Sequence, residues 1–108
     1  MDELLGGAFV YMLRCSDGAY HVGSYRGHDL RVRVSEHNSG YRRNAWTYRR
    51  RPVALVWSEH FDRYADAVAC ERQIKGWSRA KKNALIVGNY SEIKRLARSK
   101  PAKRNPSS

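Results

Sequence analysis

Glu71 is the residue whose position most needs a chemical explanation. A helix is predicted to begin near Asp62, and Glu71 lies about 20° from Tyr64 around its axis. Ala67 and Val68 flank the same position, so the carboxylate stands in the middle of the face expected to cover a core. Burying an unpaired carboxylate costs several kcal/mol. Two interpretations therefore stand: a salt bridge to an arginine across a helix interface, or a metal ligand at the edge of a cleft.

Four further side chains carry complementary chemistry. Tyr11 and His21 lie on two neighbouring predicted strands, where a phenol and an imidazole can stand side by side. Arg33 and His37 are one helical turn apart, and an arginine fork can hold two phosphate oxygens. Phosphodiester hydrolysis needs a group that positions or deprotonates water, a cation for the phosphate and a carboxylate for a divalent metal. Each residue also has an ordinary interpretation, as a core tyrosine, an edge histidine or part of a solvated helix face.

The strands and helices that would position these residues are short, and turn or cap residues mark where they begin or end. Residues 9–13 and 19–23 flank a Ser-Asp-Gly turn and predict a β-hairpin with alternating faces. Asp29 can cap a helix that ends near Asn38, before Gly40. The remaining predicted elements are a strand at residues 53–57 and helices at 62–76, 79–86 and 91–97.

The charge of the chain points to a polyanion as its partner. Twenty-one Lys and Arg against ten Asp and Glu leave a net charge of +11 and a pI near 10.2. Residues 41–51 hold five arginines among aromatic residues, without apolar periodicity, which predicts a basic loop. Such a loop can neutralise phosphates and stack unpaired bases, or can be a solvated connection. The predicted nucleic-acid contacts are Arg42, Arg43, Trp46, Arg49, Arg50 and Lys81.

Length, hydropathy and cysteine content exclude several classes of protein. A chain of 108 residues has room for one domain. Its longest apolar run, residues 4–13, is half of the roughly 20 residues that a membrane span needs, so we expect no membrane partner. Cys15 and Cys70 are too few for a disulfide scaffold or a zinc cluster. We expect both to be buried, reduced thiols in a cytoplasmic protein.

Tyr11 and His21 stand in two tripeptides that resemble the paired motifs of the GIY-YIG nuclease superfamily. These are Phe9-Val10-Tyr11 and, ten residues after that tyrosine, His21-Val22-Gly23. Each tripeptide alone would be a weak signal, but together the motifs are specific. The resemblance covers roughly residues 8–90 and is to the small, single-domain bacterial members. Further matching segments are residues 15–18, 36–40, 51–53, 71–75 and 77–81.

The resemblance implies an α/β (α+β) domain, with a three-stranded antiparallel sheet and helices in the order β-β-α-β-α-α. It also implies hydrolysis with one divalent metal, Mg²⁺ or Mn²⁺. By resemblance, Tyr11 contacts the nucleophilic water as a candidate general base, and Arg33 binds the scissile phosphate. His37 assists in the site, and Glu71 is the metal ligand. An asparagine that some members carry after the metal-binding helix corresponds to Asn83 or Asn89, and we assign it to Asn83.

Two features depart from the family pattern. His21 replaces the tyrosine of the second motif, and Tyr20 cannot stand in for it because a regular strand turns it to the opposite face. A neutral imidazole with a pKa near 6.5 is a better base at pH 7 than a phenol, so we expect activity to persist. The loop at residues 24–29 is also about two residues longer than is usual in the family.

The sequence therefore predicts a metal-dependent nuclease domain at residues 8–90 and a basic C-terminal helix and tail at 91–108. The expected substrate is DNA in preference to RNA. The alternative is a weak or inactive module that keeps the fold and binds nucleic acid without cutting it. No sequence-reading element is evident, so we expect structure-directed cleavage, with a second copy of the chain or another protein as a partner.

Overall fold

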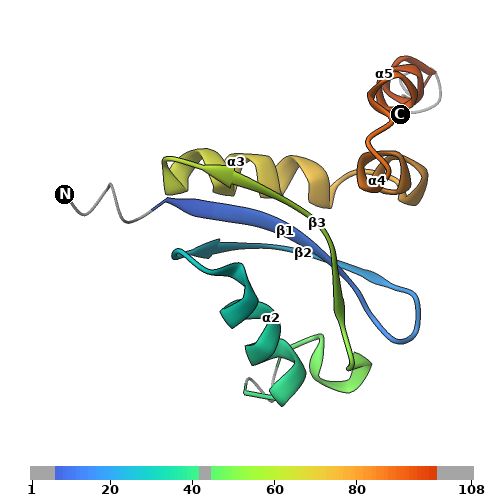
Figure 1. Ribbon diagram of the computed structural model, residues 1–108. Coiled ribbons are helices and arrows are strands. Elements are labelled where there is room, and N and C mark those ends of the chain that lie inside the picture. The colour runs from blue at the N-terminus through green and yellow to red at the C-terminus, as the bar shows by residue number, and fades with distance from the viewer. Residues whose placement is uncertain (1–6, 42–44, 100–108) are drawn as a thin grey trace. The chain divides into compact units, whose positions relative to one another are not determined.

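The computed structural model describes residues 7–41 and 45–99, with side chains as far as Ala97. Two of the predicted nucleic-acid contacts, Arg42 and Arg43, lie outside the described residues. The chain divides after Lys75 into two compact units, each of which is described by itself (Figure 1). The predicted domain boundary between residues 90 and 91 stays a prediction.

The first unit is built on a three-stranded antiparallel sheet in the order β2-β1-β3. The predicted hairpin is confirmed, because β1 (Ala8–Arg14) pairs with β2 (Tyr20–Arg26) across a turn. The second strand continues past residue 23, where a loop was expected, because Ser24 still pairs with Val10. The third strand, β3 (Ala54–Phe61), is likewise longer than predicted, since it pairs along the whole of β1.

The alternation of β1 sorts its side chains to the two faces of the sheet. Tyr11 and Leu13 pack on one face with Leu30 and Val53. The buried side chain of Val10 points to the other face. Helix α2 (Leu30–Ser39) covers the first face, and helix α3 (Tyr64–Lys75) packs against β1 and β2 on the opposite face (Figure 1). The central strand β1 is thus buried on both sides, whereas most residues of the edge strand β3 are exposed.

The ends of α2 follow the predicted cap residues. The Asp29 side chain accepts a hydrogen bond from the Arg31 backbone N–H at the first turn. Gly40 ends the helix in the left-handed region, with φ of 79°, which glycine adopts without steric cost. Leu30, Val34 and His37, spaced at helical periodicity, form its inner face: Leu30 and His37 are buried, and Val34 packs against the core.

The predicted basic loop contains one short 3₁₀ helix, Tyr48–Arg50. Thr47, immediately before it, is only 1% exposed. Asn38 ties the end of α2 to the start of the third strand, because its side chain bonds both the N–H and the C=O of Val53. Within the described part of this segment Thr47 is buried, whereas Tyr41, Trp46 and Arg49 are exposed.

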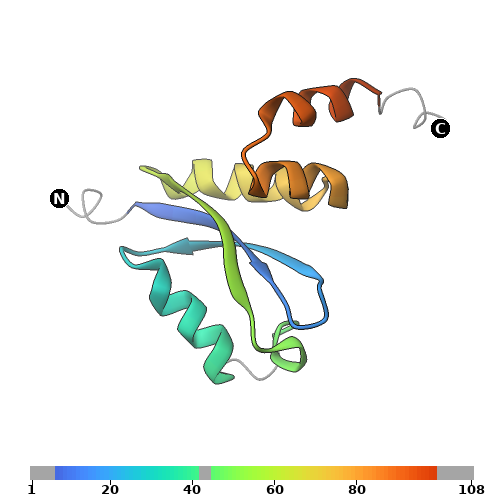
Figure 2. The ribbon, with the colours of Figure 1, turned by 45° about the vertical axis from the view of Figure 1, so that its right-hand side comes forward.

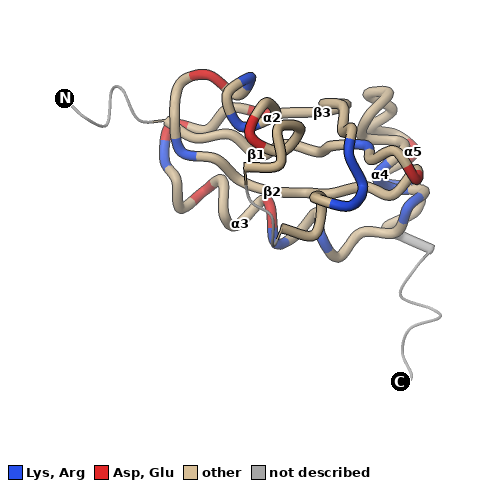
Figure 3. Tube along the Cα trace, turned by 90° about the horizontal axis from the view of Figure 1, so that it is seen from below, with Lys and Arg blue, Asp and Glu red and all other residues tan. Residues whose placement is uncertain are grey.

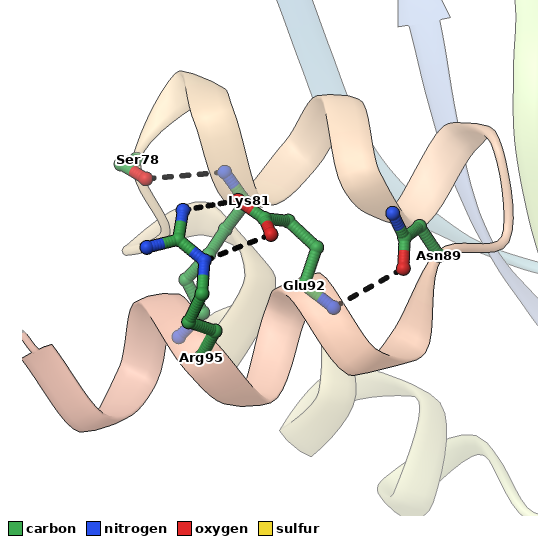
Figure 4. Close-up of polar contacts among 5 residues, drawn as sticks. All are labelled: Ser78, Lys81, Asn89, Glu92 and Arg95. Atoms are coloured by element: carbon green, nitrogen blue, oxygen red, sulfur yellow. Dashed lines mark hydrogen bonds and ion pairs between the residues drawn. The ribbon is translucent and has the colours of Figure 1, made fainter.

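The second unit contains helices α4 (Arg79–Ile86) and α5 (Tyr90–Ser99), which contact each other (Figure 2). Ser78 caps α4 by accepting a hydrogen bond from the Lys81 N–H. Asn89 accepts one from the Glu92 N–H at the first turn of α5, and Glu92 also pairs with Arg95 (Figure 4). A side chain close in sequence therefore caps the N-terminal end of each helix.

The described residues bear on two of the predictions from composition. None of their helices is both long and apolar enough to cross a membrane. Both cysteines are free thiols, Cys15 being buried as expected, whereas Cys70 is only half-buried.

Candidate active site

A hydrogen-bonded chain of three side chains lies at the centre of the candidate site. The Tyr11 hydroxyl is 3.2 Å from Nε2 of His37, and Nδ1 of His37 is 2.7 Å from Oγ1 of Thr47. Strand β1, helix α2 and the basic segment contribute one residue each. Tyr11 is 2% exposed and His37 9% exposed, so the phenol and imidazole are held in a largely desolvated setting. The structure thus brings two of the predicted site residues, Tyr11 and His37, into direct contact.

Gly23 makes room for the Tyr11 ring on the neighbouring strand. The two residues are cross-strand partners, and a Cβ at residue 23 would lie 2.6 Å from the Tyr11 hydroxyl. A real Cβ contact is never that short, so any side chain here would displace the buried ring. The glycine of the second tripeptide is therefore a steric requirement of the tyrosine in the first.

His21 lies in the same cluster of rings, on the face of the sheet that Tyr11 occupies. Its ring centroid is 6.0 Å from that of Tyr11 and 5.2 Å from that of His37, and Trp46 stacks on it at 6.1 Å. Burial, with electrostatic effects of His37 and Lys75, lowers the pKa of His21 to about 4. The imidazole is therefore neutral at pH 7, as expected, but a much weaker base than the sequence suggested.

Glu71 is half-buried on α3 and is paired with a lysine of its own helix. Its Oε2 is 2.7 Å from Nζ of Lys75, so neither the predicted arginine partner nor an unpaired carboxylate is found. Burial alone would raise the pKa of Glu71, but hydrogen bonds from Lys75 and Ser24 lower it overall. Glu71 and His21 also influence each other electrostatically, which ties the carboxylate to the ring cluster.

Arg33 stands beside the cluster on α2. Its guanidinium carbon lies 4.9 Å from the centre of the Tyr25 ring, and its charge contributes to the lowered pKa of His21. The Glu36 carboxylate is 3.6 Å from the Arg33 Nε, close enough for ionic attraction but too long for a hydrogen bond. Among the described residues this buried Nε has no hydrogen-bond partner. An anion placed here would satisfy it.

The other predicted nucleic-acid contacts divide between the two units. Arg49 is exposed, whereas Arg50 lies 3.9 Å over the Trp46 ring and 3.1 Å from the Asp17 carboxylate. Trp46 thus has two close neighbours, Arg50 and His21, and base stacking on it stays a prediction. Lys81 and Asn83 lie on α4 in the second unit, where Lys81 is 4.5 Å over the Trp77 ring.

Sequence reasoning missed three residues that contact the predicted set. Thr47, Ser24 and Lys75 hold His37 and Glu71, yet each is a common residue type whose own position looks unremarkable. Only Lys75 carried a usable signal, because residues four apart on a helix are neighbours. The other two are brought in by tertiary contacts from distant segments.

Comparison with known proteins identifies the family. The model of the GIY-YIG catalytic domain matches residues 7–83. The chain belongs to the GIY-YIG family. A UPF0213 protein of Staphylococcus aureus is 40% identical over 78 residues, which cover 72% of this chain and 92% of that protein. One from Staphylococcus saprophyticus is 38% identical over the same coverage.

A solved structure is also similar to this GIY-YIG chain. It is the solution NMR structure of a UPF0213 protein from Bacillus halodurans, with 32% identity and a TM-score of 0.47. The similarity covers 75% of this chain and 83% of that one. The names of these relatives assign them no activity.

The family match confirms the resemblance first drawn from two tripeptides and indicates a nuclease-like fold. The three-stranded antiparallel sheet, with helices on its two faces, agrees with the expected α+β architecture. In the described part of the chain, no three His, Cys, Asp or Glu side chains gather as a ready metal cage.

Proposed function

We propose that the chain is a metal-dependent nuclease that hydrolyses phosphodiester bonds, with DNA as its substrate. The observation that carries the proposal is the hydrogen bond between the Tyr11 hydroxyl and His37, within the cluster that also holds His21. A phenol needs a base to act on water at pH 7, because its ordinary pKa is near 10. Buried beside an imidazole, Tyr11 has such a base in contact.

Water activation is the first step assigned to these residues. As the attacking water loses a proton to the Tyr11 oxygen, the phenol proton passes to Nε2 of His37. The resulting hydroxide forms a bond to phosphorus while the bond from phosphorus to the leaving oxygen breaks. The leaving alkoxide then takes a proton from solvent, so protons and electron pairs balance.

His21 acts in this scheme as a neutral hydrogen-bonding group. Because burial lowers the pKa of His21 to about 4, it is unprotonated at neutral pH and too weak to serve as the main base. One ring nitrogen can still accept a hydrogen bond from water while the other donates one to a phosphate oxygen. His21 would thus position the nucleophile, in place of the tyrosine of the family motif.

Arg33 supplies the contact to the scissile phosphate. Its Nε is buried without a hydrogen-bond partner among the described residues, and a guanidinium binds two phosphate oxygens in parallel. Glu36, at 3.6 Å, keeps the side chain near the site through ionic attraction. Binding a phosphate would therefore satisfy a donor that the protein leaves unused.

The donor set fits one Mg²⁺ or Mn²⁺ ion. Magnesium favours oxygen ligands and is commonly held by one or two carboxylates, waters and substrate phosphates. Glu71 offers such a carboxylate, with the Ser24 hydroxyl next to it. When bound, the ion would stabilise negative charge on the phosphate and the leaving oxygen. The Lys75 ammonium, whose side chain is 56% exposed, must leave the Glu71 oxygen that the ion takes.

Nucleic acid as the partner is supported by where the charge lies. Residues 76–108 contain nine Lys and Arg against one Glu, a net charge of +8, whereas residues 1–75 have twelve against nine, or +3. Figure 3 marks the described charged residues along the chain. The catalytic residues thus lie in a nearly balanced unit, and most of the affinity for polyanions is assigned to the second unit.

The direct test is nicking of supercoiled plasmid DNA by the full chain, with Mg²⁺ or with a chelator. We expect metal-dependent nicking that falls at least 100-fold in Glu71→Gln and in Arg33→Met. Glu59→Gln, an exposed carboxylate on the third strand, is the matched control and should cut normally. Nicking that survives Glu71→Gln or persists in chelator would refute the proposal.

The second candidate function is binding of nucleic acid without cleavage. It is favoured by one observation, the Lys75 ammonium that already occupies the Glu71 carboxylate at 2.7 Å. A pure binding module would show DNA affinity that falls steeply with salt and is unchanged in Glu71→Gln. It would show no metal-dependent product with plasmid, single-stranded DNA or RNA.

A further inference from the structure

We infer that Thr47 is a positioning residue of the site: it accepts the Nδ1–H of His37 and so directs the Nε2 lone pair at the Tyr11 hydroxyl. The inference rests on the proposed function, since it explains how the water-activating pair is prepared. It assigns a role in the reaction to the basic segment, which the sequence had linked only to affinity.

The burial of Thr47 indicates more than a capping role. It is the only threonine of the chain, and it is 1% exposed. It occupies the N-cap position of the 3₁₀ helix Tyr48–Arg50, where a threonine hydroxyl ordinarily accepts a backbone hydrogen bond. Its side chain makes no such cap bond and lies instead 2.7 Å from Nδ1 of His37.

The direction of the two hydrogen bonds follows from the acidity of the donors. A phenol is a much stronger acid than the N–H of a neutral imidazole, so Tyr11 is the better donor across its 3.2 Å contact with Nε2. If Nε2 accepts, then the proton of the neutral ring is on Nδ1, which donates to the Thr47 oxygen. A free histidine side chain prefers the opposite tautomer, so the protein must select this one.

The selected tautomer serves the proton transfer. When the phenol proton moves to Nε2, His37 becomes an imidazolium with an N–H on each nitrogen, and Thr47 already accepts from the other one. No ring flip or proton exchange is then needed before water is activated. Without the hydroxyl, the Nε2–H tautomer would present a donor to Tyr11, and Nε2 could no longer take the phenol proton.

The decisive measurement is the ¹⁵N spectrum of the histidine rings in the wild-type protein at pH 7 to 8. His37 can be assigned among the four histidines through its loss in His37→Gln. We expect Nδ1 to be protonated and Nε2 unprotonated. The Nε2–H tautomer in the folded protein would overturn the inference without recourse to any variant.

Substitutions at Thr47 then test the role in the reaction. Thr47→Val keeps the shape but removes the acceptor, and it should shift His37 towards the Nε2–H tautomer. It should also lower kcat for plasmid nicking about tenfold with KM unchanged, the effect of one lost hydrogen bond. Thr47→Ser keeps the hydroxyl and should restore both. A folded Thr47→Val with wild-type tautomer and kcat would refute the inference.

The two proposals can fail separately. If the wild-type chain cuts nothing but His37 has the expected tautomer, the hydrogen-bonded chain is real and the nuclease proposal falls. If the chain cuts DNA and His37 is an Nε2–H tautomer, the nuclease proposal survives and the role of Thr47 is refuted. The spectrum of the wild-type protein decides the second question even if Thr47→Val does not fold.

Discussion

Lowering the pH from 7 to 5 should destabilise the protein through His21. Its pKa is about 6.5 in an unfolded chain and about 4 in the folded protein. Between these values the unfolded chain binds a proton that the folded protein excludes, so the free energy of unfolding falls as the pH falls. At about 1.4 kcal/mol per pKa unit, the loss between pH 7 and pH 5 is about 2 kcal/mol.

The size of this effect follows from the surroundings of the ring. Burial is the largest cause of the lowered pKa, and electrostatic effects of His37, Lys75 and Arg33 act in the same direction. Glu71 opposes them by favouring a protonated ring, but it is already paired with Lys75. Protonating His21 would thus place a buried cation among other cations, which the folded state avoids.

Urea-induced unfolding at pH 7, 6 and 5 measures the effect. Wild type should lose about 2 kcal/mol, a fall of roughly 10 °C in Tm for a domain of this size. His21→Tyr, which restores the family residue, cannot titrate in this range and should lose most of that dependence. His28→Asn, at an exposed position before α2, is the matched control and should behave as wild type. Equal pH dependence in His21→Tyr and wild type would refute the reasoning.

Two further predictions concern the packing of Tyr11 and the pairing of Glu71. Gly23→Ala places a Cβ 2.6 Å from the Tyr11 hydroxyl, so urea unfolding should show a loss of about 1–3 kcal/mol, and an unchanged midpoint would contradict the clash. Lys75→Met removes the ammonium that competes for the Glu71 carboxylate, so calorimetry should show tighter binding of Mn²⁺ than in wild type. Arg72→Met, which removes a positive charge from the same helix, is the control for net charge. Equal tightening of Mn²⁺ binding in Lys75→Met and Arg72→Met would attribute the effect to net charge and contradict the prediction.

Local signals in the sequence predicted most of the fold correctly. The Ser-Asp-Gly turn, the Asp29 cap and Gly40 are short-range features, and the hairpin and α2 follow them closely. Strand lengths were predicted less well, because β2 and β3 extend for as long as their residues can pair with residues of β1. A strand boundary of that kind is a property of the pairing and cannot be read from one segment.

The sequence by itself determined the family, and it also predicted a set of site residues. Two tripeptides, an Arg33 and His37 pair on one helix, and a carboxylate in an apolar stripe are patterns of type and spacing. Strand periodicity placed Tyr11 beside His21, and helical periodicity placed Arg33 beside His37, but neither pattern paired Tyr11 with His37. The contact of 3.2 Å between Tyr11 and His37 is a product of tertiary packing.

Only the tertiary structure decided how these groups behave chemically. Burial of the ring, with electrostatic effects of His37 and Lys75 from other segments, lowers the pKa of His21 to about 4, and desolvation has no signature in a linear sequence. Thr47 reaches His37 across ten residues of chain, and the Lys75 ammonium rather than an arginine neutralises Glu71. Residue types and spacing select the chemistry, whereas burial and long-range contacts set protonation and orientation.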